Sequence, residues 1–204
     1  MNDAKIRHQF HRKKLRRQHD DSDTVVVDEL GLKHGRCRAD IAVINGHIIG
    51  YEIKSDDDSL RRLPKQINVY SAVFDRASMI VGEKHACAVK SMIPAWWGIV
   101  LTTEGPRGGM TFTVDRKAHL NRSVDPFSVA QLLWRNEVAE VLETLGAEKK
   151  TLRAPRKVLY QCLASEIDLT ELRRQVRMCF KARTGWRCPE PPSPGVGLSQ
   201  PCAR

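Results

Sequence analysis

Residues Arg38–Tyr70 read RADIAVINGHIIGYEIKSDDDSLRRLPKQINVY, and this stretch decides the fold. Strand-forming residues lie on both sides of an Asn-Gly pair, which predicts strands over 36–44 and 47–54 joined by a hairpin turn. A proline is tolerated in the first turn of a helix, so we expect the helix that follows to begin near Leu63. The stretch therefore predicts a hairpin followed by a helix.

Charged side chains are predicted to meet at one point of this hairpin. Glu52 and Lys54 are two residues apart on a strand, so they point to the same face, and Asp40 lies on the preceding strand. Carboxylates that hold Mg²⁺ neutralise a phosphate and make a nucleophile from water near neutral pH. Asp40 and Glu52 are thus candidate metal ligands for phosphodiester hydrolysis. Lys54 can position the attacking water or stabilise charge at the phosphate.

The register of the hairpin decides whether the two carboxylates meet. A two-residue turn at the Asn-Gly pair would put Asp40 on the face away from Glu52. A three-residue loop over 44–46 would pair Val43 with His47 and bring both acids to one face. It would also gather five apolar residues on the opposite face, namely Ile41, Val43, Ile49, Tyr51 and Ile53. We therefore predict the three-residue loop.

Gln66 and Tyr70 are four residues apart and so lie on one face of the predicted helix. Together with Asp40 and Glu52-Ile53-Lys54, this QxxxY pair resembles the PD-(D/E)xK nuclease superfamily, in particular its RecB-like members. The resemblance implies a catalytic site made of Asp40, Glu52, Lys54, Gln66 and Tyr70. The chain departs from the superfamily's pattern at Ala39, which stands where a proline is usual.

The resemblance implies a fold and a cofactor. The fold is α/β, a restriction-endonuclease-like core with a mixed central sheet flanked by helices, followed by a helical C-terminal extension. The cofactor is Mg²⁺, with Mn²⁺ as an alternative, and both one and two ions stay open. The implied metal ligands are Glu29, Asp40, Glu52 and the backbone carbonyl of Ile53. Glu29 resembles an early acid that some members add, and its alternative is an exposed carboxylate at a strand end.

A wider resemblance covers about residues 25–133, with Trp96-Trp97-Gly98 and Leu132-Leu133-Trp134-Arg135. These segments resemble a family of bacterial and phage proteins assigned to the same superfamily. That resemblance implies DNA as the partner and a role in DNA repair, defence or phage biology. It also admits a homodimer, since many enzymes of this fold act as dimers. The paired tryptophans are expected to pack in the core rather than to stack on bases.

The charge of the chain indicates a polyanionic partner. Of its 204 residues, 41% are hydrophobic and 28% charged, as in soluble globular proteins, and the formal net charge is +10. Nucleic acid is the first expected partner, and a solvated basic surface is the plainer alternative. A basic helix over 5–18 can contact phosphates. The candidate nucleic-acid-binding residues are Arg12, Lys13, Lys14, Arg16, Arg17, Arg36 and Arg38.

Other classes of protein find no support in the sequence. The longest apolar run, residues 92–101, is too short to cross a bilayer, and no signal peptide is recognised at the N-terminus. We therefore expect a cytoplasmic protein without a membrane partner. The six cysteines form no CxxC pair, which indicates neither a zinc cluster nor a disulfide framework. A GxxxxGK[ST] loop is absent, so ATP-driven translocation is not expected.

The chain is predicted to have four parts. They are a basic N-terminal helix (1–23), the nuclease-like core (24–122), the helical extension (123–184) and a disordered Pro/Gly-rich tail (185–204). Beyond the hairpin we expect core strands over 24–30, 77–82, 97–103 and 110–114, and a helix over 86–92. In the extension we expect helices over 126–145, 156–164 and 169–182.

Three hypotheses of function follow. The first is a Mg²⁺-dependent nuclease that hydrolyses DNA phosphodiester bonds. The second is a catalytically silent DNA-binding accessory module that keeps the nuclease fold. The third is an interaction protein that uses the helical extension to bind a partner. The intact acids and lysine favour the first, because a silent site would be free to lose them.

Overall fold

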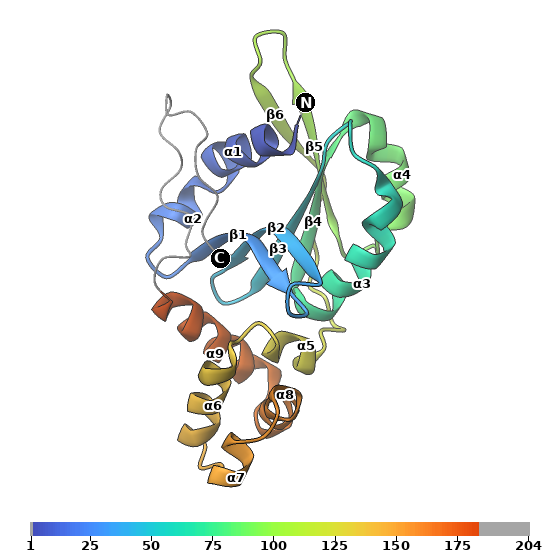
Figure 1. Cartoon of the computed structure of the whole chain (residues 1–204). Coiled ribbons are helices and arrows are strands. Elements are labelled where there is room, and N and C mark those ends of the chain that lie inside the picture. Colours follow the sequence, from blue (N-terminus) through green and yellow to red (C-terminus); the bar gives the residue numbers. More distant parts are fainter. Residues whose placement is uncertain (1, 184–204) are drawn as a thin grey trace.

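The computed structural model describes residues 2–183, which form a mixed sheet with helices on both faces and a helical C-terminal part (Figure 1). The strands are β1 (Val25–Leu32), β2 (Cys37–Ile44), β3 (Ile48–Lys54), β4 (Arg76–Gly82), β5 (Gly98–Glu104) and β6 (Met110–Arg116). They neighbour one another in chain order. β3-β4 and β4-β5 are parallel, and the other neighbouring pairs are antiparallel. The expected α/β class with a helical extension is confirmed, whereas the expected tail over 185–204 lies outside the described residues.

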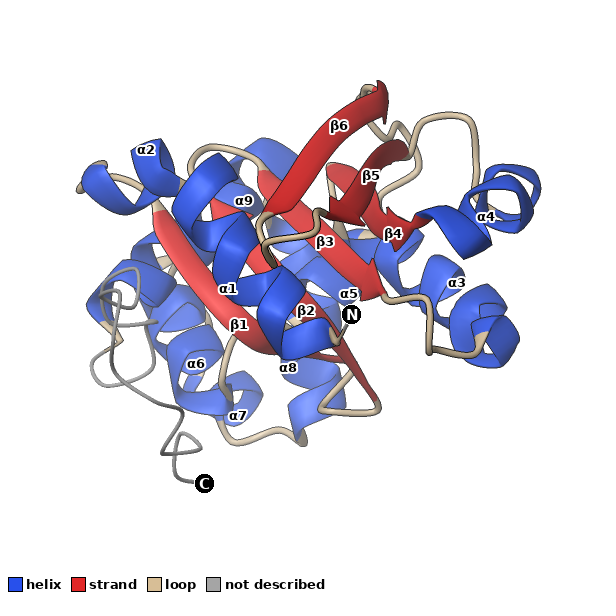
Figure 2. Cartoon of the chain, turned by 90° about the horizontal axis from the view of Figure 1, so that it is seen from above, coloured by secondary structure: helices blue, strands red, loops and turns tan. Residues whose placement is uncertain are grey.

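Two N-terminal helices, α1 (Asp3–Lys14) and α2 (Arg16–Asp20), lie across one face of the sheet (Figure 2). α1 inserts Ile6 and Phe10 into a buried apolar cluster on that face. The expected single helix over 5–18 is wrong. Leu15 leaves helical geometry, with φ −106° and ψ 9°, and its side chain is buried in the same cluster. The sheet residues of this cluster include Ile41, Val43, Ile53, Ile80 and Val100.

The opposite face of the sheet carries α3 (Leu63–Val73) and α4 (Ala86–Met92), which follow short 3₁₀ turns. As expected, α3 begins at Leu63 with a proline in its first turn. Tyr70 is fully buried there, and its ring centroid lies 4.8 Å from that of Phe74 and 5.3 Å from that of Trp97. The expected packing of Trp97 is confirmed by its complete burial, while Trp96 is partly exposed.

The helical part below the sheet consists of α5 (Pro126–Ala130), α6 (Arg135–Thr144), α7 (Lys149–Leu152), α8 (Arg156–Glu166) and α9 (Leu169–Ala182). The expected continuous helix over 126–145 is wrong. Trp134 is extended, and its amide donates to Glu137 Oε2 at 2.6 Å, so α6 begins with its own cap. α9 has the expected bounds, 169–182. None of the helices between residues 2 and 183 combines the length and apolar character needed to cross a membrane.

The hairpin between β2 and β3 has a three-residue loop, as predicted, but at 45–47 instead of 44–46. Ile44 pairs with Ile48, and Val43 pairs with Ile49 rather than with His47. This register buries both Ile44 and Ile48, which the predicted register would have left in or beside the loop. The two registers differ by two residues, so each side chain keeps its face. The predicted apolar face is confirmed, because its five residues all belong to or pack against the cluster under α1.

A buried ion pair joins the helical part to the sheet. Asp75, just before β4, is completely buried and forms a salt bridge with Arg173 of α9. The same carboxylate accepts a hydrogen bond of 2.8 Å from the amide of Ile48 at the start of β3. Asp75 therefore connects the hairpin, β4 and the last helix. A buried carboxylate that loses its cationic partner is costly, so this contact stabilises the packing of α9.

We expect Arg173→Leu to lower the free energy of unfolding by about 2 to 4 kcal/mol, because the buried Asp75 carboxylate would lose its arginine and keep only the more distant, exposed His47, at 3.8 Å. Arg174→Leu is the matched control, since Arg174 is exposed on the same helix and pairs with Glu171 at the surface. The control should cost less than about 1 kcal/mol. Urea denaturation of both variants measures the difference. Equal losses would show that the buried pair has no special role.

Candidate active site

β2 and β3 separate at the row that contains Asp40 and Glu52. Their pairing ends at Ile41 and Tyr51, after which β2 continues beside β1 and β3 continues beside β4. Asp40 and Glu52 are the next residues along the two strands and share a face. The amide of Ile53, which β2 no longer reaches with its backbone, donates instead to Asp40 Oδ2 at 2.7 Å. The separation of the strands therefore fixes the Asp40 carboxylate beside Glu52.

Glu52 is the centre of the site. Its side chain is 1% exposed and accepts hydrogen bonds from three donors. Lys54 Nζ lies 2.7 Å from Oε1, Tyr70 OH lies 2.5 Å from Oε2, and Gln66 Nε2 also donates to Oε1. Lys54 Nζ is in addition 3.2 Å from the carbonyl oxygen of Ile53. The structure thus brings together the five side chains that the sequence suggested: Asp40, Glu52, Lys54, Gln66 and Tyr70.

The ionisation of the site follows from burial and from charges close together. Burial, and then the charge of Glu52, raise the pKa of Asp40 to about 7, against the opposing effect of its bond from the Ile53 amide. Burial, followed by the charges of Glu52 and Asp40, raises the pKa of Tyr70 well above its ordinary value. Burial lowers the pKa of Lys54, but Glu52 and Asp40 outweigh it and the net shift is upward. Tyr70 therefore stays a neutral donor, and Lys54 stays an ammonium.

The oxygens at this point fit a hard cation. Across residues 2–183, no three His, Cys, Asp or Glu side chains are grouped to hold a metal ion. The donors present are the carboxylates of Asp40 and Glu52 and the carbonyl of Ile53. Lys54 already places a positive charge against two of these oxygens, Glu52 Oε1 and Ile53 O. Mg²⁺ is commonly held by one or two carboxylates and several waters, and this donor set suits it.

Glu29, the fourth expected ligand, lies beside an arginine that the sequence did not single out. It stands in β1 between Asp28, which pairs with Ile41, and Leu30, and it has a positive φ of 53°. Its Oε1 is 2.5 Å from Arg7 Nη2 of α1. The same Nη2 lies 3.4 Å from Asp40 Oδ1. No local pattern distinguishes Arg7 from the other basic residues of α1, so only the packing of the helix reveals it.

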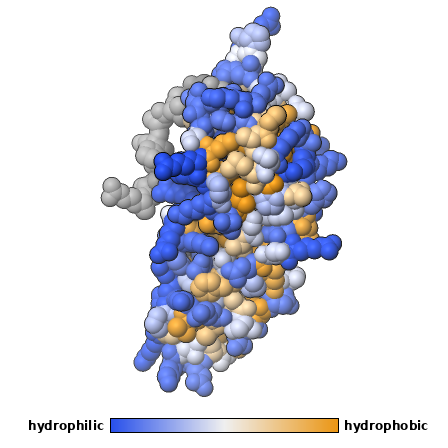
Figure 3. Space-filling model, turned by 90° about the vertical axis from the view of Figure 1, so that its right-hand side faces the viewer, coloured by the Kyte–Doolittle hydropathy of each residue, from blue (hydrophilic) through white to orange (hydrophobic). Residues whose placement is uncertain are grey.

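The seven basic residues expected to bind nucleic acid are all exposed and lie on α1, α2, the β1-β2 turn and the start of β2. A second exposed basic group, which no sequence pattern had singled out, lies in the 3₁₀ turn before α3 and in its first turn and consists of Arg61, Arg62 and Lys65. Arg62 is four residues before Gln66, a spacing that could have indicated it. On the side of the molecule that carries α3 and α4, hydrophilic residues surround a smaller apolar area (Figure 3).

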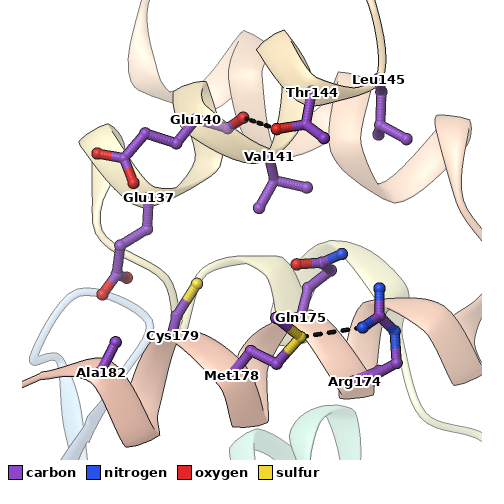
Figure 4. A pocket seen from close by; sticks show the side chains of 10 residues that line it. All are labelled: Glu137, Glu140, Val141, Thr144, Leu145, Arg174, Gln175, Met178, Cys179 and Ala182. Atoms are coloured by element: carbon purple, nitrogen blue, oxygen red, sulfur yellow. Dashed lines mark hydrogen bonds between the residues drawn. The ribbon is translucent and has the colours of Figure 1, made fainter.

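A pocket of about 400 Å³ lies between α6 and α9 (Figure 4). Apolar side chains including Val141, Leu145 and Met178 line it, with Arg174 Nη1 3.0 Å from Met178 Sδ. None of the five clustered residues lines this pocket. The candidate active site is therefore the opening between β2 and β3, covered by α1 and α3.

The fold and the clustered side chains define a mixed α/β protein with a buried carboxylate-lysine site. The chain belongs to the Bacteriophage P4 protein cII family, whose model matches residues 3–187. It is similar to Protein cII of Enterobacteria phage P4, with 26% identity over 162 residues. That similarity covers 79% of this chain and 60% of the relative, so the chain spans about 60% of the relative's length. No solved structure matches the chain.

The family match extends from α1 through α9, so it includes both the sheet and the helical part. The description of the family names no reaction, cofactor or ligand. The resemblance of the site to the PD-(D/E)xK superfamily therefore stays a prediction.

The raised pKa of Asp40 predicts that its charge opposes folding. An acid whose pKa is raised from 3.8 to about 7 on folding binds its proton more tightly when folded. The free energy of unfolding must then fall as the pH rises from about 4 to 7, by up to about 4 kcal/mol. We expect Asp40→Asn to remove this decrease and to be more stable than the wild type at pH 8.

Urea denaturation at pH 5 and pH 8 measures this effect. Asp20→Asn, at an exposed residue of α2, is the control for the loss of one carboxylate and should keep the wild-type pH dependence. An Asp40→Asn curve parallel to that of the wild type would contradict the expectation.

Proposed function

We propose that the chain is a Mg²⁺-dependent nuclease that hydrolyses DNA phosphodiester bonds on a restriction-endonuclease-like core. The observation that carries this proposal is the convergence of Asp40, Glu52 and Lys54 where β2 and β3 separate, with Gln66 and Tyr70 both donating to Glu52. Two acids, a lysine and a carbonyl at one point form a donor set for Mg²⁺ and phosphate chemistry. The positive net charge of +10 supports a polyanionic substrate.

Each residue of the site has a role in this proposal. Asp40, Glu52 and the Ile53 carbonyl would hold Mg²⁺, which supplies an activated water and neutralises charge on the phosphate. Tyr70 and Gln66 fix the orientation of Glu52 by their hydrogen bonds. Lys54, which stays protonated, leaves its contact with Glu52 and stabilises negative charge on the attacking water or the phosphate. Its position on β3, two residues after Glu52, keeps Lys54 on the same face as the acids.

The exposed basic groups would hold the nucleic-acid backbone on either side of the opening. Arg36 lies on the β1-β2 turn and Arg38 at the start of β2, whereas Arg61, Arg62 and Lys65 lie in the 3₁₀ turn before α3 and in its first turn. Such contacts carry no sequence information and weaken as the salt concentration rises. The relative from phage P4 favours a phage setting over DNA repair or defence.

A specific observation also supports the second candidate, a DNA-binding accessory module without turnover. Lys54 compensates Glu52, and Arg7 contacts Asp40, so cations of the protein itself already stand at the acids. A site compensated in this way can be stable without a metal ion. Cleavage separates the two functions, because both predict salt-sensitive DNA binding and only one predicts cutting.

Cleavage of labelled single-stranded, duplex and branched DNA, with RNA as a further arm, tests the proposal in Mg²⁺ or Mn²⁺. We expect the wild type to cut, and Asp40→Ala and Lys54→Ala to bind DNA but to cut at least about 100-fold more slowly, because each removes charge stabilisation at the phosphate. Lys149→Ala, at an exposed residue of α7, is the control and should cut at the wild-type rate.

Two results would contradict the nuclease proposal. Binding without cutting by the wild type on every substrate would favour the accessory module. Cutting that survives in both Asp40→Ala and Lys54→Ala would show that the activity does not arise from this site.

A further inference from the structure

Arg7 is held firmly within the candidate site. Its neighbour Ile6 is completely buried, and Phe10, one turn further along α1, is also buried in the cluster on the sheet. These contacts pack α1 against the sheet. The helix therefore carries Arg7 to a fixed point beside β1 and β2.

The two contacts of Arg7 are unequal. Its Nη2 lies 2.5 Å from Glu29 Oε1, whereas it lies 3.4 Å from Asp40 Oδ1, near the limit of a hydrogen bond. Glu29, the acceptor of the first contact, lies in β1 with a φ of 53°, a conformation that is uncommon for a residue with a side chain. Arg38 Nη1 lies a further 4.0 Å from Glu29 Oε2. Both carboxylate oxygens of Glu29 therefore face arginines, and Glu29 holds Arg7 more closely than Asp40 does.

We propose, on the basis of the proposed nuclease function, that Arg7 is the second cation of this site. It binds the scissile phosphate beside a single divalent ion, and Glu29 positions Arg7 rather than binding metal. Arg7 would be a catalytic residue and Glu29 a positioning residue. The reaction would then need one ion, held by Asp40, Glu52 and the Ile53 carbonyl.

The charges at the site support this assignment. A second divalent ion held by Asp40 and Glu29 would compete with the Arg7 guanidinium, which already contacts both carboxylates. If Asp40 held a metal ion, its weak contact with Arg7 would be lost, while the closer contact of Arg7 with Glu29 would remain. The guanidinium has five N–H donors in a planar fork, which suits a phosphate. The Arg7 side chain is 22% exposed, so the guanidinium is not closed off from solvent.

Metal titration of the full chain tests the role of Glu29 without relying on activity. Calorimetry with Mn²⁺ should give one ion per wild-type chain and one for Glu29→Gln, with affinities within about threefold, because Glu29 is not a ligand. Asp40→Asn should lose this binding. Two ions in the wild type would overturn the proposal. Loss of binding in Glu29→Gln as complete as in Asp40→Asn would also overturn it.

Arg7→Gln tests the second cation directly. We expect cleavage to fall by about 100-fold or more, since a preorganised donor at the phosphate is lost, while Mn²⁺ affinity stays equal or rises because a competing cation is gone. Arg7→Lys, which keeps the charge, should recover part of the rate. Arg153→Gln, an exposed residue after α7, is the control for the charge change. Thermal melting identifies a variant that has merely lost its fold.

The outcomes separate the two proposals. If the wild type neither cuts nor binds Mn²⁺, the nuclease function fails and the role of Arg7 fails with it. If the wild type cuts and binds one ion but folded Arg7→Gln cuts at the same rate, the role of Arg7 alone is overturned. If folded Arg7→Gln and Arg7→Lys lose Mn²⁺ binding together with cleavage, Arg7 only supports the site structurally, and the proposal also fails.

Discussion

The hydrogen bond from the Ile53 amide to the Asp40 carboxylate marks the point on which the site depends. At this point β2 and β3 separate, and the Ile53 amide has no backbone acceptor on β2. The Asp40 carboxylate accepts its hydrogen bond instead. A buried amide needs a partner, so the opening is stable only with a residue such as Asp40 at that place. On the face of the sheet that carries α3, Glu52 accepts hydrogen bonds from Gln66 and Tyr70.

Burial of the acids requires cations close by. Glu52 is almost wholly buried, and an ionised carboxylate is costly there unless it is paired and hydrogen-bonded. Lys54 and Arg7 provide that compensation from β3 and α1. The acids are therefore compensated by cations of the protein itself. Cleavage is the measurement that distinguishes a nuclease from a binding module, because this compensation is compatible with both.

The sheet and the helical part form one structural unit in the described chain. Asp75 and Arg173 join them through a buried ion pair, and α5 and α9 pack residues such as Val129 and Val176 into the same apolar cluster as the sheet. The match to the Bacteriophage P4 protein cII family likewise spans both parts. The helical part is therefore better regarded as support for the face of the sheet that carries α3 than as a separate module.

The sequence by itself determined what depends on local backbone geometry. Alternation with a period of two put Glu52 and Lys54 on one face, and four-residue spacing joined Gln66 to Tyr70, because strand and helix geometry fix these relations. Only the tertiary structure decided the contacts between distant segments, such as the burial of Ile44 and Ile48 that moved the hairpin loop and the approach of Arg7 to Glu29. It also decided the break between α5 and α6, where α6 begins with its own cap at Trp134. These depend on how whole elements pack, and many sequences of similar local pattern would pack differently.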